Sequence, residues 1–350
     1  MSELTLQNVT KTFGTITALN NVSFTVKDKE FFVLLGPTGA GKSTTLRVVC
    51  GLEKPESGHV LMDGQVCDDM TPSDRDVAIV FQQYSLYPTM TVYENMAFPL
   101  KAPGRKLPKE EIKKKIEDAA EKLRITHLLD RKTAQLSGGE MQRVSIGRAI
   151  VRRPRVFLMD EPLSNLDAKL RETLRAELKH LQKVEGVTTL YVTHDQIEAL
   201  TMADKIGVLN HGNLVQVGTP EDIYDRPASA YVAKLVGSPR INLLPGKLAN
   251  GNLSLSDLEI EIVVDKKITN DHVDVGIRPE NVLITSSGKF KGEVILTEPL
   301  GAETVIHIKC GKGELVSMVA GLVQYKHGDI VNFEIDKTHL HFFNEQGDRI

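Results

Sequence analysis

The fold is decided by the stretch Gly36-Pro37-Thr38-Gly39-Ala40-Gly41-Lys42-Ser43. It has the spacing of a phosphate-binding loop: a glycine, four residues, then Gly-Lys followed by serine or threonine. An apolar run at 31–35 precedes it and Thr44 opens a helical stretch after it, which is the context that such a loop needs. The inward amides and the helix N-terminus favour an anion, so Lys42 is predicted to reach the β- and γ-phosphates of a nucleotide and Ser43 to bind Mg²⁺.

Three more apolar runs, at 77–81, 156–159 and 189–192, extend this pattern. Each ends where polar or glycine residues begin, and amphipathic helical stretches lie between them. This predicts an α/β domain with a mostly parallel buried sheet, whose strand ends bind the ligand. One-sided apolar spacing indicates packing helices at 112–123 and 170–181.

Two carboxylates, Asp160 and Glu161, follow the run at 156–159. One is predicted to hold Mg²⁺ and the other to handle an attacking water, with a strand-end ion pair as the alternative. Neighbouring strand residues point to opposite faces, so the two carboxylates must play different roles if both reach the site.

The pattern of apolar and polar residues changes after Gly237-Ser238-Pro239. Apolar and polar residues then alternate at 258–262, 273–277 and 331–335, with glycine and Asn-Gly turns between such stretches. This predicts a small antiparallel barrel or sandwich of about 110 residues. The predicted domains are 1–237, with a mainly helical insertion at about 89–155, and 238–350.

Composition excludes several other classes of protein. The chain has 350 residues, enough for two to three domains, and its apolar content excludes a disordered chain. The 43 Lys and Arg residues against 46 Asp and Glu residues give no charge-based reason to expect a nucleic-acid partner. Cys50, Cys67 and Cys310 form no Cys-x-x-Cys pair, so we expect buried thiols in a reducing compartment and no zinc site.

Targeting and membrane-spanning segments are not expected. Residues 1–8 lack a basic segment followed by an apolar run, so no secretory signal is predicted. The longest apolar runs have about five residues, whereas roughly 20 are needed to span a bilayer. We therefore expect a protein that stays in the cytoplasm and does not cross a membrane by itself.

A third motif, Leu136-Ser137-Gly138-Gly139-Glu140, stands between the phosphate-binding loop and the two carboxylates. With it, the chain resembles the ATP-hydrolysing subunits of ATP-binding-cassette (ABC) transporters, whose signature is Leu-Ser-Gly-Gly-Gln. In that family the signature of one subunit closes over the nucleotide held by a second subunit. The resemblance implies ATP and Mg²⁺ as ligands and a head-to-tail homodimer, or a heterodimer with a related ATPase. Ser137 and the amides after it open a helical stretch, a second anion-binding helix N-terminus.

The resemblance assigns roles to further residues. Phe13 matches the aromatic residue that stacks on adenine, and Gln82 matches the glutamine that approaches Mg²⁺ and the water. Asp167 matches the loop that crosses the dimer interface, although it also fits an N-cap of the following helix. His194 matches the switch histidine that contacts the γ-phosphate. The implied catalytic residues are Glu161, His194, Gln82 and Lys42; the nucleotide-binding residues are Phe13, Gly36, Pro37, Thr38, Gly39, Ala40, Gly41, Lys42, Ser43, Thr44, Ser137, Gly138, Gly139, Glu140 and Asp167; the metal ligands are Ser43, Gln82 and Asp160.

Glu140 departs from the family pattern because glutamine is usual at this place in the signature. A carboxylate that faces a nucleotide across the interface is mildly unfavourable unless a neighbour such as Arg143 compensates its charge. We therefore expect dimer closure to be weaker or sensitive to salt, with activity retained.

Longer stretches at 82–95, 160–170 and 191–196 resemble the maltose-type carbohydrate importer ATPases. Gly276-Ile277-Arg278-Pro279-Glu280 is similar to a motif in the regulatory barrel that follows their cassette. The resemblance implies a cassette ATPase domain with a helical subdomain, followed by an all-β OB-like regulatory barrel. It also implies a peripheral subunit at the cytoplasmic face of the membrane that drives two membrane-spanning permeases, with an extracytoplasmic solute-binding protein as an indirect partner.

Solute and regulation stay open at this point. Sugars are the leading solutes, followed by glycerol phosphate, polyamines and inorganic ions, because other subunits select the solute. The tyrosines at 84, 87 and 93 are predicted to form a permease-docking surface, with buried packing as the alternative. A soluble cassette ATPase acting on ribosomes or DNA, and a barrel that binds a cytoplasmic regulator or a small solute, are the rival interpretations.

Overall fold

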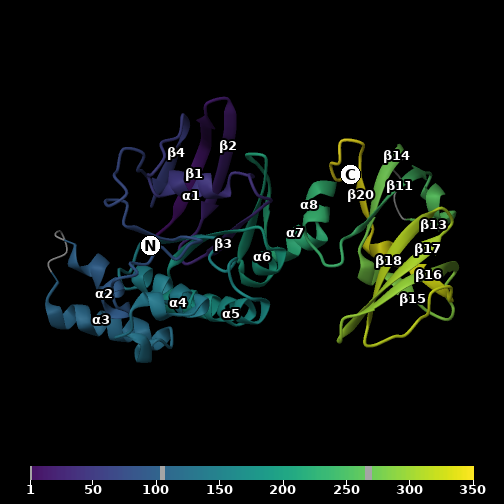
Figure 1. Cartoon of the computed structure of the whole chain (residues 1–350). Coiled ribbons are helices and arrows are strands. Elements are labelled where there is room, and N and C mark those ends of the chain that lie inside the picture. The colour runs from purple at the N-terminus through teal and green to yellow at the C-terminus, as the bar shows by residue number, and fades with distance from the viewer. Residues whose placement is uncertain (1, 103–106, 265–269) are drawn as a thin grey trace. The chain divides into compact units, whose positions relative to one another are not determined.

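The computed structural model describes residues 2–102, 107–264 and 270–350. The chain divides into two compact units, one up to Pro220 and one from Glu221 to Ile350 (Figure 1). This division falls earlier than the boundary predicted after residue 237.

A four-stranded antiparallel sheet forms one part of the first unit. Its order is β2-β1-β4-β5, with β1 (Leu4–Phe13), β2 (Ile16–Val26), β4 (Ser57–Met62) and β5 (Gln65–Val66). Burial in β1 starts with a period of two, since Leu4 and Leu6 are buried and Thr5 between them is partly exposed. Phe24 of this sheet stacks on Phe32 of the next one, with ring centroids 4.9 Å apart, so the two sheets share a core.

A six-stranded sheet carries the predicted buried strands. Its order is β10-β9-β3-β8-β7-β6, with β3 (Phe31–Leu35), β6 (Val77–Val80), β7 (Val156–Asp160), β8 (Thr188–Thr193), β9 (Lys205–Asn210) and β10 (Asn213–Gly218). The strands from β9 to β6 run parallel, and β10 is an antiparallel edge. Every residue of β3 and β8 is buried, as central strands covered on both faces require. The four predicted strands are confirmed, although β6 ends at Val80 rather than Phe81.

Helices follow strands of this sheet along the chain. They are α1 (Lys42–Val49), α2 (Val92–Ala97), α3 (Lys109–Lys122), α4 (Gly138–Ile150), α5 (Ala168–Glu185) and α6 (Gln196–Met202), with 3₁₀ turns at Phe98–Lys101, Thr126–Leu128 and Thr133–Gln135. Helix α1 leads from β3 to β4 of the antiparallel sheet. Helices α2, α3 and α4 pack on one another (Figure 1), so the chain between β6 and β7 is mainly helical. The predicted apolar faces of α3 and α5 are buried, except that Leu170 is only partly covered.

Two five-stranded antiparallel sheets form the second unit. Their orders are β13-β12-β11-β14-β20 and β15-β19-β16-β17-β18, with β11 (Asn242–Ala249), β12 (Asn252–Leu255), β13 (Ile260–Val263), β14 (Asn270–Ile277), β15 (Val282–Ile284), β16 (Phe290–Pro299), β17 (Glu303–Cys310), β18 (Gly313–Ala320), β19 (Ile330–Ile335) and β20 (His341–Phe343). Residues from both sheets, including Leu253, Val275 and Phe333, form one apolar core. The predicted all-β barrel-like domain is therefore confirmed, with Leu258 in a 3₁₀ turn rather than a strand.

A buried arginine, Arg278, fixes two short helices to the strands of this unit. They are α7 (Pro220–Asp225) and α8 (Ala230–Leu235). The guanidinium of Arg278, 2% exposed, donates to the backbone oxygens of Tyr224 at 2.9 Å and Val236 at 2.5 Å. It also lies 4.0 Å from the centre of the Tyr224 ring, whose hydroxyl donates to Glu280. These contacts join the helical segment to the barrel and explain why the compact unit begins before residue 237.

The three cysteines are buried, as expected from the sequence. Cys50, Cys67 and Cys310 are buried free thiols, and burial raises the pKa of each. They belong to the apolar cores of the two units. Among the described residues, no helix combines the length and the apolar character that crossing a bilayer requires.

Candidate nucleotide-binding site

The loop at 36–43 needs glycine at both ends of its pattern. Gly41 has a φ of 105°, and a Cβ added there would lie 2.5 Å from the carbonyl oxygen of Ala18. A Cβ at Gly36 would lie 2.5 Å from the carbonyl oxygen of Leu209. Only glycine fits such close approaches of backbone to backbone. The tight loop feeds directly into α1, which places the helix N-terminus at the site.

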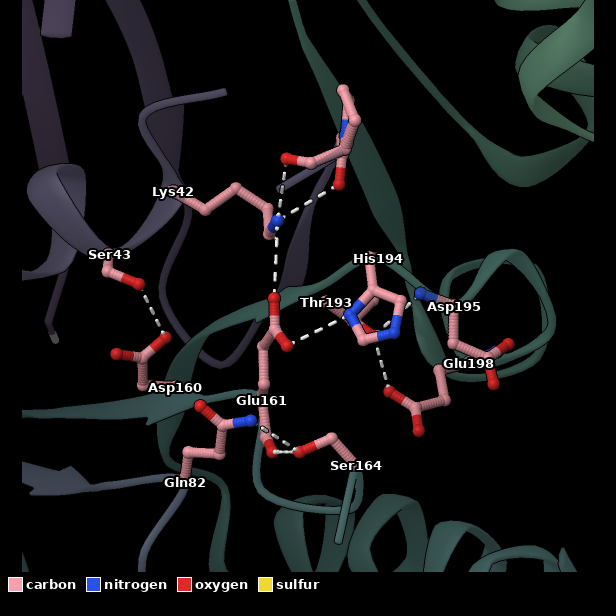
Figure 2. A network of polar contacts seen from close by, with 12 residues as sticks. Lys42, Ser43, Gln82, Asp160, Glu161, Ser164, Thr193, His194, Asp195 and Glu198 are labelled. Atoms are coloured by element: carbon pink, nitrogen blue, oxygen red, sulfur yellow. Dashed lines mark hydrogen bonds and ion pairs between the residues drawn. The ribbon is translucent and has the colours of Figure 1, made fainter. Parts of the chain in front are cut away.

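Lys42 is the first residue of α1, and its ammonium group is held inside the loop. The side chain is 5% exposed and donates to the carbonyl oxygens of Gly36 at 2.9 Å and Pro37 at 3.0 Å. Its third contact is with Glu161 Oε1 at 3.2 Å (Figure 2). These partners use all three donors of the ammonium group. The ammonium group is therefore held in place by three oxygens of the protein.

Asp160 and Ser43 face each other across the site. Ser43 Oγ donates to Asp160 Oδ1 at 3.0 Å. Burial raises the pKa of Asp160, and the charge of Glu161 adds to this effect, whereas the hydrogen bond from Ser43 opposes it. A divalent cation beside this carboxylate would instead favour its ionised form. A hydroxyl and a carboxylate oxygen in contact fit Mg²⁺, which takes few protein oxygens and completes its shell with phosphate and water.

Glu161 reaches the same site because its backbone leaves the strand conformation. Its φ is 43°, in the left-handed region that costs a non-glycine residue about 1–2 kcal/mol. The Glu161 amide donates to the carbonyl oxygen of Val192 at 3.1 Å, which holds this turn against β8. The carboxylate then contacts Lys42 through one oxygen and His194 Nδ1, at 2.9 Å, through the other (Figure 2).

The turn that carries His194 is anchored by a buried carboxylate. Glu198 of α6 is 2% exposed and accepts from the hydroxyls of Tyr191 at 2.8 Å and Thr193 at 2.6 Å. Thr193 Oγ1 in turn accepts from the amide of Asp195 at 3.0 Å. Burial raises the pKa of Glu198, while the two hydroxyl donors lower it. The residues on both sides of His194 are thus tied to one buried group (Figure 2).

Lys42, Ser43, Asp160, Glu161 and His194 line one cleft with a volume of about 550 Å³, within the range of small-molecule sites. Its lining residues are Ile16, Thr17, Ala18, Thr38, Gly39, Gly41, Lys42, Ser43, Thr44, Gln82, Asp160, Glu161, His194 and His211. Four of these residues, Ile16, Thr17, Ala18 and His211, were not predicted from the sequence. His211 lies in the β9–β10 turn, where the Gly212 amide donates to the Ala40 carbonyl at 3.0 Å; the turn was visible in Asn210-His211-Gly212-Asn213, but its contact with the loop was not.

Phe13 and Asp167 lie outside the lining of this cleft. Phe13 is 43% exposed at the end of β1 and pairs with Ile16, which does line the cleft. The ammonium of Lys11 lies 5.0 Å from the centre of its ring. Asp167 is the N-cap of α5 and accepts from the Leu170 amide at 2.9 Å, so the predicted capping role is confirmed.

The signature residues also lie outside the cleft, at the N-terminus of α4. Ser137 is the N-cap, and Glu140 completes a capping box. Both the amide and the hydroxyl of Ser137 donate to Glu140 Oε2 at 2.8 Å, and these bonds lower the pKa of Glu140. Arg143 does not compensate the charge of Glu140, because its guanidinium pairs with Glu177 instead.

A parallel sheet with a phosphate-binding loop after the central strand β3, a histidine after the adjacent strand β8 and a carboxylate pair at the end of the next strand, β7, defines a nucleotide-hydrolysing cassette. The chain belongs to the ATP-binding proteins of ABC transporters, in the MalK/UgpC group of carbohydrate-type importers with a TOBE domain. It is an ATPase that hydrolyses ATP to drive transport. Residues 19–164 match the ABC transporter family, 237–282 the MalK OB fold domain and 275–343 the TOBE domain.

Relatives of known name resemble the chain over almost its whole length. The sn-glycerol-3-phosphate import ATP-binding protein UgpC of Psychromonas ingrahamii is 46% identical, with 98% of this chain and 94% of that protein covered. The trehalose/maltose import ATP-binding protein MalK of Thermococcus litoralis is 44% identical, with 99% and 98% covered. The solved dimeric structure of MJ0796, a bacterial ABC transporter cassette, has a TM-score of 0.56 and 34% identity and covers 62% of this chain and 98% of that chain.

Proposed function

We propose that this chain energises the uptake of a sugar through separate permease subunits. The observation that carries the catalytic part is the contact of Lys42, Glu161 and His194 within one cleft. The similarity to a trehalose/maltose import protein extends over both units and supports a sugar as the solute. As a subunit carried by permeases, the chain would lie at the cytoplasmic face of the membrane.

ATP would bind with its phosphates in the loop at 36–43 and its adenine near Phe13. Mg²⁺, held by oxygens of Ser43, Asp160 and Gln82, would supply neutralisation of phosphate charge. Glu161 accepts a proton from the water that attacks the γ-phosphate, and His194 orients the Glu161 carboxylate. A water–phosphorus bond forms while the bond to the β-phosphate oxygen breaks, so ADP and phosphate leave. Lys42 stabilises the charge on the transferred group.

The position of the signature supports a site shared between two subunits. Ser137, Gly138 and Gly139 open α4 but do not line the cleft of their own chain. A second copy, arranged head to tail, would place them over the nucleotide, and a relative cassette is dimeric in its solved structure. Closure around two ATP molecules would pull the permeases toward one state, and hydrolysis would release them.

Replacing Glu140 by glutamine is expected to strengthen ATP-dependent dimer formation. Glutamine keeps the capping-box geometry, because its side-chain oxygen can still accept from the Ser137 hydroxyl. It removes the negative charge that would face the triphosphate bound by the partner. We expect the ATP concentration for half-maximal dimer to fall about two- to fivefold at low salt, and the difference to shrink at high salt. Light scattering of Glu161→Gln with and without Glu140→Gln measures this, and equal midpoints at low salt would contradict it.

A second cleft offers a docking surface for a permease segment. It has a volume of about 490 Å³ and is lined by apolar and aromatic residues, among them Tyr87, Phe98 and Leu52, together with Arg148. Tyr87 is 39% exposed and packs on Phe98, with ring centroids 4.8 Å apart. Tyr84 and Tyr93 are absent from this lining. Of the three predicted tyrosines, only Tyr87 is therefore proposed to contact the permease.

The solute is tested by deleting the gene in its host and measuring uptake of radiolabelled trehalose, maltose and sn-glycerol-3-phosphate. We expect sugar uptake to be lost, to return with the parent gene and to stay absent with Glu161→Gln. Loss of glycerol-phosphate uptake alone would favour the second candidate, which rests on the similarity to the UgpC protein. Undiminished uptake of all three solutes would contradict both proposals.

A further inference from the structure

One arginine joins the loop at 164–167 to the turn that carries His194. Arg171, in the first turn of α5, donates through Nη2 to the carbonyl oxygen of Leu166 at 3.0 Å and to that of Ser164 at 3.5 Å. Its Nη1 lies 3.4 Å from Asp195 Oδ2, where the two side chains form an ion pair. The planar guanidinium therefore spans two loops that lie far apart in the sequence.

Asp195 uses its two carboxylate oxygens for different partners. Oδ1 caps α6 by accepting from the amides of Ile197 at 2.7 Å and Glu198 at 3.2 Å. Oδ2 meets Arg171. Because Asp195 is directly bonded to His194 along the backbone, a movement of Arg171 is passed to the histidine that contacts Glu161. On the other side of His194, the Thr193 hydroxyl donates to the Glu198 carboxylate and holds the turn there (Figure 2).

The loop at 164–167 is also bonded to the catalytic side of the cleft. Ser164 Oγ donates to the carbonyl oxygen of Glu161 at 2.8 Å and accepts from Gln82 Nε2 at 3.2 Å (Figure 2). Asn165 Nδ2 donates to the carbonyl oxygen of Gln82 at 3.0 Å. A displacement of this loop therefore reaches Glu161 and Gln82 directly, and reaches His194 through Arg171.

We propose that Arg171 is a positioning residue that sets His194 according to the state of the loop at 164–167. The inference rests on the proposed two-subunit site, in which a partner docks on this loop. Docking then fixes the two carbonyls that hold Arg171, and Arg171 fixes Asp195 and the His194 turn. Hydrolysis at one nucleotide becomes dependent on the pairing of the two subunits, so ATP turnover is cooperative.

The test compares Arg171→Gln, Arg171→Lys and Asp195→Asn in the full chain. Each is expected to lower kcat about tenfold, since small misplacements of catalytic groups have effects of this size, and to bring the Hill coefficient for ATP toward unity. Lysine does not rescue, because one ammonium cannot reproduce the planar fork. Asparagine at 195 keeps an oxygen for the α6 cap. A lower kcat and Hill coefficient in Asp195→Asn therefore report on the missing ion pair with Arg171. A fluorescent ATP analogue should bind all three within about twofold of the parent.

Two comparisons distinguish transmission from general damage. Arg175→Gln, one turn further along α5, is the matched control and should keep the parent's cooperativity. The double variant Arg171→Gln, Asp195→Asn should be no slower than Arg171→Gln alone, because that change already breaks the ion pair that Asp195→Asn removes. Parent-like cooperativity in Arg171→Gln, or losses that multiply in the double variant, would overturn the proposal. If Glu161→Gln alone fails to dimerise with ATP, the proposed two-subunit function fails instead.

Discussion

Glu161→Gln is expected to lower the rate of ATP hydrolysis by about 10²- to 10⁴-fold while ATP still binds. Glutamine keeps the size of the side chain and an oxygen for Lys42, but it cannot accept a proton from water. The left-handed φ of 43° at this position shows that the fold holds the carboxylate in place at a cost in backbone strain. Such a position is expected where the side chain has a chemical task.

Measurement of this variant combines single-turnover hydrolysis with light scattering. Unhydrolysed ATP, with and without Mg²⁺, should shift the variant from a smaller to a dimeric or more compact species. Glu172→Gln, an exposed change of the same chemistry on α5, is the matched control and should hydrolyse ATP like the parent. Hydrolysis at the parent rate by Glu161→Gln would show that another group activates the water.

Lys42→Ala is expected to weaken ATP binding itself, by about 100-fold, because it removes a charge-assisted contact to phosphate. The structure adds a second cause. Without the ammonium, the carbonyls of Gly36 and Pro37 and the carboxylate of Glu161 lose the cation that they share. The negative charge left near the phosphates then opposes binding.

Calorimetric titration with ATP measures this loss, and the melting temperature without nucleotide checks that the loop still folds. Lys54→Ala removes an exposed lysine that pairs with Asp69 and should leave ATP affinity at the parent value. An unaltered ATP affinity in Lys42→Ala would contradict the role assigned to this ammonium. A reduced hydrolysis rate with unchanged ATP affinity would show that Lys42 acts in the hydrolysis step and not in ATP binding.

Elements whose signals are local could be predicted from the amino-acid sequence alone. The loop at 36–43 is visible because its glycines and the lysine stand at fixed spacing beside a buried strand. The caps at Ser137 and Asp167 are equally local, since an N-cap bonds to amides two or three residues away. The period-two pattern after residue 237 indicated the β unit for the same reason.

Which side chains meet depends on how separate elements pack in the folded chain. Alternation along β7 gave no reason for Asp160 and Glu161 to face one cleft; the hydrogen bond between Glu161 and Val192 of the neighbouring strand turns the second carboxylate toward His194. The pairing of Arg143 with Glu177, rather than with Glu140, likewise depends on how α4 packs on α5.

Contacts across long sequence separations explain what the sequence did not reveal. His211 reaches the cleft because β9 lies beside β3, and Arg171 reaches Asp195 because α5 begins after the end of β7, beside the end of the neighbouring parallel strand β8. Spacing rules describe neighbours within one element, whereas the order of strands in a parallel sheet is set by packing between distant elements. The phosphate-binding residues of the loop are therefore recognisable from their local spacing. The arrangement of Asp160, Glu161 and His194 around that loop depends on how distant strands pack.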